Sequence, residues 1–301
     1  MTFTNSRVLL AKISRLFAIA ISAALLCAAG FGIAPSEAQE IDYGHVIDLV
    51  EQQSMLVEKM SKESVLIALR ADPSGRMANL RNSHDLFNDI QAGHREGNPR
   101  LGLRPSKNPV VLDRLALVDS LWPLFDGAIR KALNSGAVGR GEIDTLAELS
   151  QPILDALAGA ADAYVAEANS RQLHSMLAIT IGTASRQRLL SQRMAKEFFL
   201  IAYRHQVRRN TSRLKESTEL FDQSMNALIQ GSPQERLIAP PTLEIRSQLE
   251  AARQVWVQIK PLMEPALVGN VPNEDEIVKV ADLTADLLEA IGQALTLYMA
   301  L

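Results

Sequence analysis

The fold is decided by one stretch of the sequence, Ala184-Ser185-Arg186-Gln187-Arg188-Leu189-Leu190-Ser191-Gln192-Arg193-Met194-Ala195-Lys196. The stretch contains no glycine or proline, and its apolar residues recur at intervals of three and four, which predicts the middle of a long helix. On a helical wheel, one stripe is expected to face the bundle to which this helix belongs. It consists of Thr183, Gln187, Leu190, Met194 and Ile201.

A second stripe runs along nearly the opposite side of the same helix. Its members are Leu177, Ile181, Ala184, Arg188, Ser191, Ala195 and Ala202. Because only Arg188 and Ser191 interrupt its small or apolar character, we expect this face to pack against another helix. A guanidinium removed from water there needs either a carboxylate partner or an exchangeable anion from solution, and the spacing leaves both open. A solvated basic face is a further alternative.

From Arg186 onward the run reads Arg-x-Arg-Leu-x-Ser-x-Arg-Met-Ala-Lys. It resembles the first helix of the N-terminal domain of type IV pilus methyl-accepting chemotaxis transducers, the PilJ-type domain. It is also similar to the periplasmic box of nitrate/nitrite sensor histidine kinases, in which the first arginine binds the anion at a symmetric dimer interface. The resemblance implies that Arg188 binds the ligand and that Ser191 and Arg193 match the later serine and arginine. The candidate ligand-binding residues are therefore Arg188, Ser191, Arg193 and Arg186. Arg186 and Arg193 also flank the core stripe, and for these two residues structural support or salt bridging is a simpler interpretation.

The chain also contains an internal duplication. Residues 41–167 align without a gap to residues 175–301, with about 30 identities in about 127 positions, which exceeds the chance level for this composition. Trp122 pairs with Trp256, and Tyr164 pairs with Tyr298. The first copy keeps the outer stripe but has Ser54 where the second copy has Arg188. We therefore expect a ligand role only in the second copy.

Each copy is expected to form four helices separated by glycine- and proline-bearing breaks. The ranges are 42–71, 76–93, 109–134 and 140–169 in the first copy, and 172–208, 210–230, 242–268 and 274–300 in the second. The predicted fold class is all-α, with two tandem up-and-down four-helix bundles. Because no strong helix-ending signal lies between residues 143 and 208, we expect one long shared helix to join the bundles end to end. The predicted domains are 39–169 and 170–301.

Residues 1–38 have the pattern of a signal peptide. Arg7, Lys12 and Arg15 precede an apolar run over 16–34, and Ser36-Glu37-Ala38 provides a cleavage site. We expect cleavage near Ala38 and a periplasmic chain, or else an inner-membrane anchor formed by 16–34. The single cysteine, Cys27, lies in this segment, so the mature chain is expected to have no disulfide.

The composition and motifs point away from several classes of function. The net charge of −3 and the absence of a basic stripe argue against a nucleic-acid partner. The histidines at 45, 84, 94, 174 and 205 show no metal-ligand spacing, so no metal or cofactor is expected. With no phosphate-binding loop and no nucleophile near a histidine, we do not expect an enzyme.

The resemblance implies a periplasmic sensory protein that binds a small anion, with nitrate or nitrite as the first candidates. It is expected to act without an output domain of its own and to pass its state to a membrane receptor, kinase or transporter. A homodimer through the first helices would place Arg188 beside its symmetry mate, whereas a chain folded back on itself would set Arg188 against Ser54. The alternative function is a structural or assembly module of the cell envelope or the type IV pilus system.

Overall fold

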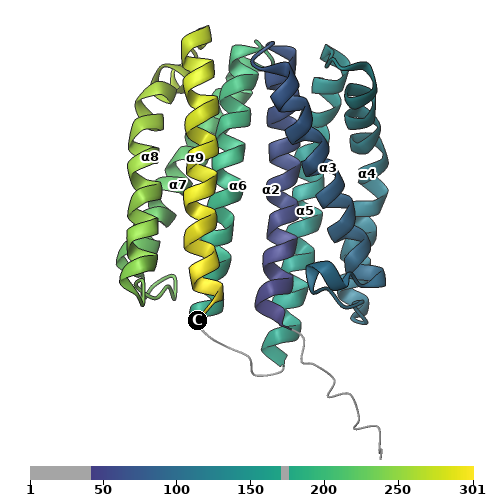
Figure 1. The fold of residues 1–301 in the computed structure, drawn as a ribbon, viewed down its shortest axis with the longest axis vertical. Coiled ribbons are helices and arrows are strands. Elements are labelled where there is room, and N and C mark those ends of the chain that lie inside the picture. The colour runs from purple at the N-terminus through teal and green to yellow at the C-terminus, as the bar shows by residue number, and fades with distance from the viewer. Residues whose placement is uncertain (1–41, 171–175) are drawn as a thin grey trace, which may run out of the picture. The chain divides into compact units, whose positions relative to one another are not determined.

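Eight α-helices dominate the part of the chain that this computed structural model describes, residues 42–170 and 176–301 (Figure 1). The signal-peptide prediction for residues 1–38 lies outside the described residues. In chain order the helices are α2 (Tyr43–Ala68), α3 (Pro73–Glu96), α4 (Pro109–Ser135), α5 (Arg140–Ser170), α6 (Met176–Ala202), α7 (Val207–Gln230), α8 (Leu243–Leu267) and α9 (Glu274–Met299). A short 3₁₀ turn, η1 (Pro99–Leu101), follows α3. The all-α prediction is confirmed, and most helix ends fall within a few residues of the expected positions.

Local sequence explains where the helices begin and end. Asn273 caps α9 in a reciprocal capping box with Glu276, which satisfies two backbone donors at the helix start. Glycines in positive-φ conformations end α3 and α7, at Gly97 and Gly231. The first helix of the second half ends at Ala202 instead of near 208, because the backbone turns sharply there and Arg204 has a φ of 59°.

The internal repeat is visible in the backbone. Adding 134 to the bounds of α3 gives the bounds of α7, and the isolated bridge Asn98–Leu103 recurs as Ser232–Leu237. The indole of Trp122 donates to the side-chain oxygen of residue 88, and the indole of Trp256 donates to that of residue 222. Each half therefore builds the same four-helix unit, in which sequence neighbours pack against each other and the fourth helix returns to the first.

The two halves are not joined end to end. Tyr43, at the start of α2, donates to Glu167 near the end of α5 (2.7 Å), and Ser61 lies 3.0 Å from Ser150, so α5 runs antiparallel to α2. By contrast, Asp48 of α2 contacts Ser185 of α6. Ten residues on, Glu58 contacts Arg193. Because α6 runs parallel to α2 and α5 runs antiparallel to it, the chain direction reverses between Ser170 and Met176. The expected long shared helix is wrong.

This reversal brings the first helices of the two halves together, as Figure 1 shows for α2 and α6. Val65 and Leu66 of α2 and Ile143 of α5 belong to the same hydrophobic cluster as the core of the second half. Residues Asp42–Leu301 accordingly form one compact unit. The division into domains at 169/170 stays a sequence prediction. None of the described helices combines the length and the hydropathy that a membrane crossing requires.

Candidate functional site

The candidate site lies in the contact between α2 and α6, which we call the seam. The outer stripe of α6, predicted to pack against another helix, packs here against the matching stripe of α2. Small or β-branched side chains allow close approach, and they include Val50, Ser54, Val57, Ser61, Ala184, Ser191 and Ala195, each at most 5 % exposed. The seam of the folded-back alternative therefore exists within one chain. These faces of α2 and α6 cover each other, so neither face is exposed to form a homodimer.

Arg188 lies inside this seam and is 8 % exposed. Its Nη2 is in direct contact with Asp48 Oδ1 on α2, and Asp48 is itself only 7 % exposed. Ser185, one turn before Arg188, donates to the same Asp48 oxygen at 2.8 Å. The partner is thus Asp48 and not Ser54, which occupies the corresponding position in α2. Of the two possibilities that the spacing left open, the structure contains the carboxylate partner.

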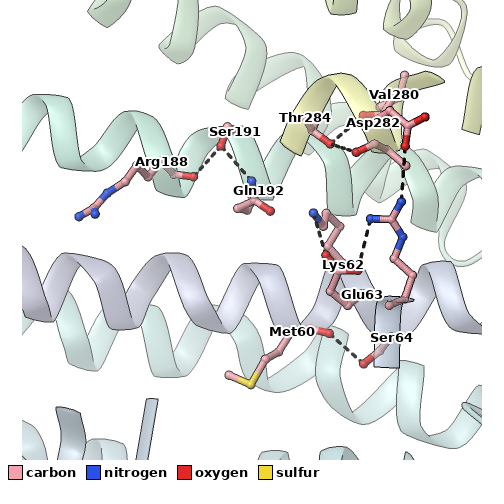
Figure 2. Close-up of polar contacts among 12 residues, drawn as sticks. Met60, Lys62, Glu63, Ser64, Arg188, Ser191, Gln192, Val280, Asp282 and Thr284 are labelled. Atoms are coloured by element: carbon pink, nitrogen blue, oxygen red, sulfur yellow. Dashed lines mark hydrogen bonds and ion pairs between the residues drawn. The ribbon is translucent and has the colours of Figure 1, made fainter. Parts of the chain in front are cut away.

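The side chain of Ser191 forms its hydrogen bonds within α6. Its hydroxyl donates to the backbone oxygen of Arg188 at 2.8 Å and accepts from Gln192 Nε2 at 3.1 Å, as Figure 2 shows. Ser191 and Gln192 are fully buried. Arg188 Nε and Gln192 Oε1 are buried without a hydrogen-bond partner among the described residues. The guanidinium therefore has unused capacity although its Nη2 is paired.

The other two candidate arginines also reach across the seam to acids of α2. Arg186 is 62 % exposed at its side chain and lies 3.4 Å from Glu51. Arg193 donates to Glu58 Oε1 at 3.0 Å, and Lys196 Nζ lies 2.5 Å from Glu58 Oε2. Salt bridging, the simpler of the two interpretations for Arg186 and Arg193, is the arrangement in the structure.

Burial and charge act differently on the acids of the seam. Burial raises the pKa of Glu51, and the neighbouring guanidinium of Arg186 opposes this without reversing it. Burial also acts to raise the pKa of Glu58, but Lys196 and Arg193 outweigh it, so the net pKa lies below the usual value. Glu58 is therefore a fixed anion that holds two cations of α6.

Sequence reasoning missed the acidic side of the seam. Asp48, Glu51 and Glu58 are spaced so that they follow one face of α2, and the second half has Gly182, Ser185 and Gln192 at these positions. Conversely, the first half has Gln52, Ser54 and Lys59 at the positions that Arg186, Arg188 and Arg193 occupy in α6. Comparing the charges of the two copies, and not only the loss of the arginines, reveals an acidic helix made to pair with a basic one.

Other residues weighed from the sequence have structural partners. Gln53 donates to Gln91 at 2.9 Å and Gln187 to Ser224 at 2.5 Å, so both amides bond within their own bundles, as the core-facing interpretation predicts. Trp256 is buried at 3 % exposure. Within residues 42–170 and 176–301, no group of three or more histidine, cysteine, aspartate or glutamate side chains could hold a metal ion.

Residues 168–283 match the family described as the N-terminal domain of type IV pili methyl-accepting chemotaxis transducers. This part of the chain is therefore similar to a PilJ domain. The match covers α6, α7, α8 and the first part of α9, so it includes every candidate arginine. It indicates a sensory role related to chemotaxis transducers or type IV pili.

Residues 42–167 lie outside the PilJ match, and their relation to it rests on the internal repeat. No curated protein and no solved structure shows significant similarity to the chain. The seam therefore joins the PilJ domain to a second bundle of the same design, and the residues that the motif supplies face acids from that bundle.

Proposed function

We propose that this chain is a periplasmic sensory module of a chemotaxis-like or type IV pilus-related signalling system, with the seam between α2 and α6 as its responding element. The observation that carries the proposal is the position of Arg188. The arginine of the motif lies in the segment that matches the PilJ family, and it is buried between the first helices of two bundles. The resemblance to the nitrate/nitrite sensor kinases implies an anion at this arginine. A change in its partner would alter how α6 lies against α2.

The ligand chemistry follows from the groups around Arg188. A guanidinium binds planar oxyanions through paired N–H groups, and Arg188 Nε has no hydrogen-bond partner among the residues that the structure describes. Nitrate or nitrite is the first ligand to test. Either anion has to displace the carboxylate of Asp48, which is already held by Arg188 and Ser185. Binding is therefore an exchange of one anion for another, and it would release Asp48 and loosen the seam.

A movement in the seam would change the packing of both halves, and a partner protein could respond to that change. The hydrophobic cluster of the second half includes residues of α2 and α5, so a shift of α6 against α2 changes packing in both halves. We propose that a membrane receptor, kinase or transporter reads this change. A signal peptide cleaved near Ala38 would deliver the chain to the compartment in which such a partner exposes its sensory face.

The test is thermal unfolding of the wild type and two variants in sodium nitrate, with sodium chloride at equal ionic strength as the reference. Nitrate should raise the Tm of the wild type and leave that of Arg188→Ala unchanged. Asp48→Ala should respond more strongly because its internal competitor is gone. A ligand at about one hundred times its Kd stabilises a fold by about 2.7 kcal/mol, which is readily detected. Equal nitrate shifts in the wild type and Arg188→Ala would remove Arg188 as the site.

The Arg188–Asp48 pair also favours a second function, because a guanidinium satisfied within its own chain needs no ligand. The chain would then be a structural or assembly module of the cell envelope or the pilus system. In that case nitrate stabilises Asp48→Ala but not the wild type. A stable complex with an envelope or pilus protein should then be recovered by pull-down.

A further inference from the structure

A polar cavity of about 320 Å³ lies beside the seam and is separate from Arg188. Gln151 of α5 lines one side, α6 contributes three residues, and α7 contributes three more. The contributions of the last two helices are Arg193, Lys196, Glu197, Arg213, Glu216 and Ser217. A water molecule occupies about 30 Å³, so the space could hold about ten waters or one small organic molecule. Every side chain that lines it is polar or charged, which suits a small hydrophilic ligand.

The charges around the cavity are unequally satisfied. Arg193 and Lys196 share the carboxylate of Glu58, which holds both in place. Arg213, on α7, forms no ion pair with any described residue and is partly buried. Its guanidinium is therefore the cation of this cavity that is available to an incoming anion.

Glu197 is the acid most deeply buried in the lining, at 2 % exposure, and its only hydrogen-bond donor among the described side chains is Ser217, at 2.9 Å. Burial raises its pKa to about 7, a rise that the charge of Lys196 partly opposes. A carboxyl group in this state is partly protonated at neutral pH. In the protonated form it removes one negative charge from the cavity and can donate a hydrogen bond.

The first half of the chain provides an internal comparison. Its counterpart of Glu197 is Glu63, which Figure 2 shows in contact with Lys62, at 3.0 Å. Glu63 also pairs with Arg76 at 3.7 Å. The second half has Asn210 in place of this arginine, and the amide of Asn210 donates to the backbone of His205 instead. The acid of the second half has therefore lost its guanidinium partner.

The residues that α7 contributes to the cavity also differ in charge between the two halves. Arg213 and Glu216 correspond to Asn79 and Asn82 of the first half, so the charges that face this cavity are particular to α7. Three cations then stand against Glu58, Glu216 and a half-neutral Glu197, which leaves the site with a positive balance once Glu197 is protonated. A single carboxylate would neutralise that balance.

We propose that the cavity between α5, α6 and α7 binds a small organic carboxylate, with its carboxylate group on the guanidinium of Arg213. Ser217 and Gln151 offer uncharged hydrogen-bonding groups to the rest of the molecule. Because Arg193 and Lys196 join the cavity to Glu58 of α2, an occupied cavity is connected to the seam. The site does not require a ligand at Arg188, so it goes beyond the proposed function.

The experiment is isothermal titration calorimetry of the purified chain with sodium succinate. Succinamide is the uncharged probe of matched size, and sodium chloride is the control for ionic strength. Succinate should bind and succinamide should not. Arg213→Asn, which introduces the residue of the first half, should raise the Kd for succinate at least about tenfold, because one charge-assisted contact is lost. Arg208→Asn makes the same change at an exposed position of α7 and should leave the Kd unchanged.

Two further variants separate this proposal from the others. Arg188→Ala should bind succinate as the wild type does, whereas the nitrate response depends on Arg188. Succinate should bind more tightly at pH 6 than at pH 8, and Glu197→Gln should flatten this dependence. The groups that face Glu197 are Glu58 of α2, Lys196 and Arg193 of α6, Ser217 of α7, and the other residues of the lining. No binding up to about 10 mM, or equal binding by Arg213→Asn, would overturn the proposal.

Discussion

The Arg188–Asp48 contact predicts a large energetic coupling between two helices that are distant in sequence. Both residues are less than 9 % exposed, and the carboxylate is held by the hydroxyl of Ser185 as well. Removing one partner of such a pair leaves a buried charge without compensation, which typically costs 3–5 kcal/mol. We expect Arg188→Met and Asp48→Asn each to lower the free energy of unfolding by about 3 kcal/mol.

The double variant should be less destabilised than the sum of the single ones. Once both charges are gone, no buried ion remains, so a coupling energy of about 2 kcal/mol or more is expected from the cycle. Urea denaturation with linear extrapolation provides the four free energies. The methionine keeps most of the apolar stem of Arg188, which limits the contribution of lost packing.

A matched control lies on the same two helices. Arg186 and Glu51 also form a cross-seam pair, but the arginine side chain is 62 % exposed. The cycle of Arg186→Met and Glu51→Gln should therefore show a coupling below about 1 kcal/mol. If both cycles gave the same small coupling, Arg188 would be solvated in solution, and the account of the seam as a charge-closed contact would be refuted.

Three further predictions concern other positions. The pKa of Glu197 is about 7 in the folded chain, above the ordinary 4.5, so the free energy of unfolding of the wild type should fall by about 2 kcal/mol between pH 5 and pH 8. Glu197→Gln should not show this fall, and urea titrations at both pH values test it. His94 acts in the opposite sense, because burial lowers its pKa from 6.5 to about 4. Its contribution to the free energy of unfolding is fully present above pH 6.5, and about 2 kcal/mol of it is lost by pH 5. His94→Gln should not show this loss in the same titrations. Gly231→Ala should destabilise the chain by at least about 1 kcal/mol, because φ is +79° and a Cβ would lie 2.9 Å from the backbone nitrogen of Ala239. Gly292 lies within α9 with open space beside it, and Gly292→Ala should raise the Tm because alanine favours the helix by about 1 kcal/mol. Thermal unfolding of the two variants checks both signs.

The sequence alone was sufficient for the helices and for the repeat. Local signals set most helix ends, since caps such as Asn273 and breaks such as Gly231 act within one turn. The two-sided pattern of α6 likewise predicted a helix covered on both faces, with Arg188 in a contact between helices. These features depend on residues close together in the chain, so periodicity and spacing carry them.

Only the tertiary structure decided what Arg188 meets. The sequence allowed a straight rod, a dimer or a folded-back chain, because no local signal between Ser170 and Met176 states the direction of the next helix. Once α6 runs parallel to α2, an offset of about one hundred and forty residues brings Asp48 to Arg188. The same packing decides that Glu197 faces a cavity with Arg213. Whether a buried charge is paired depends on which helix covers it, and that is a property of the whole fold and not of the stretch that carries the charge.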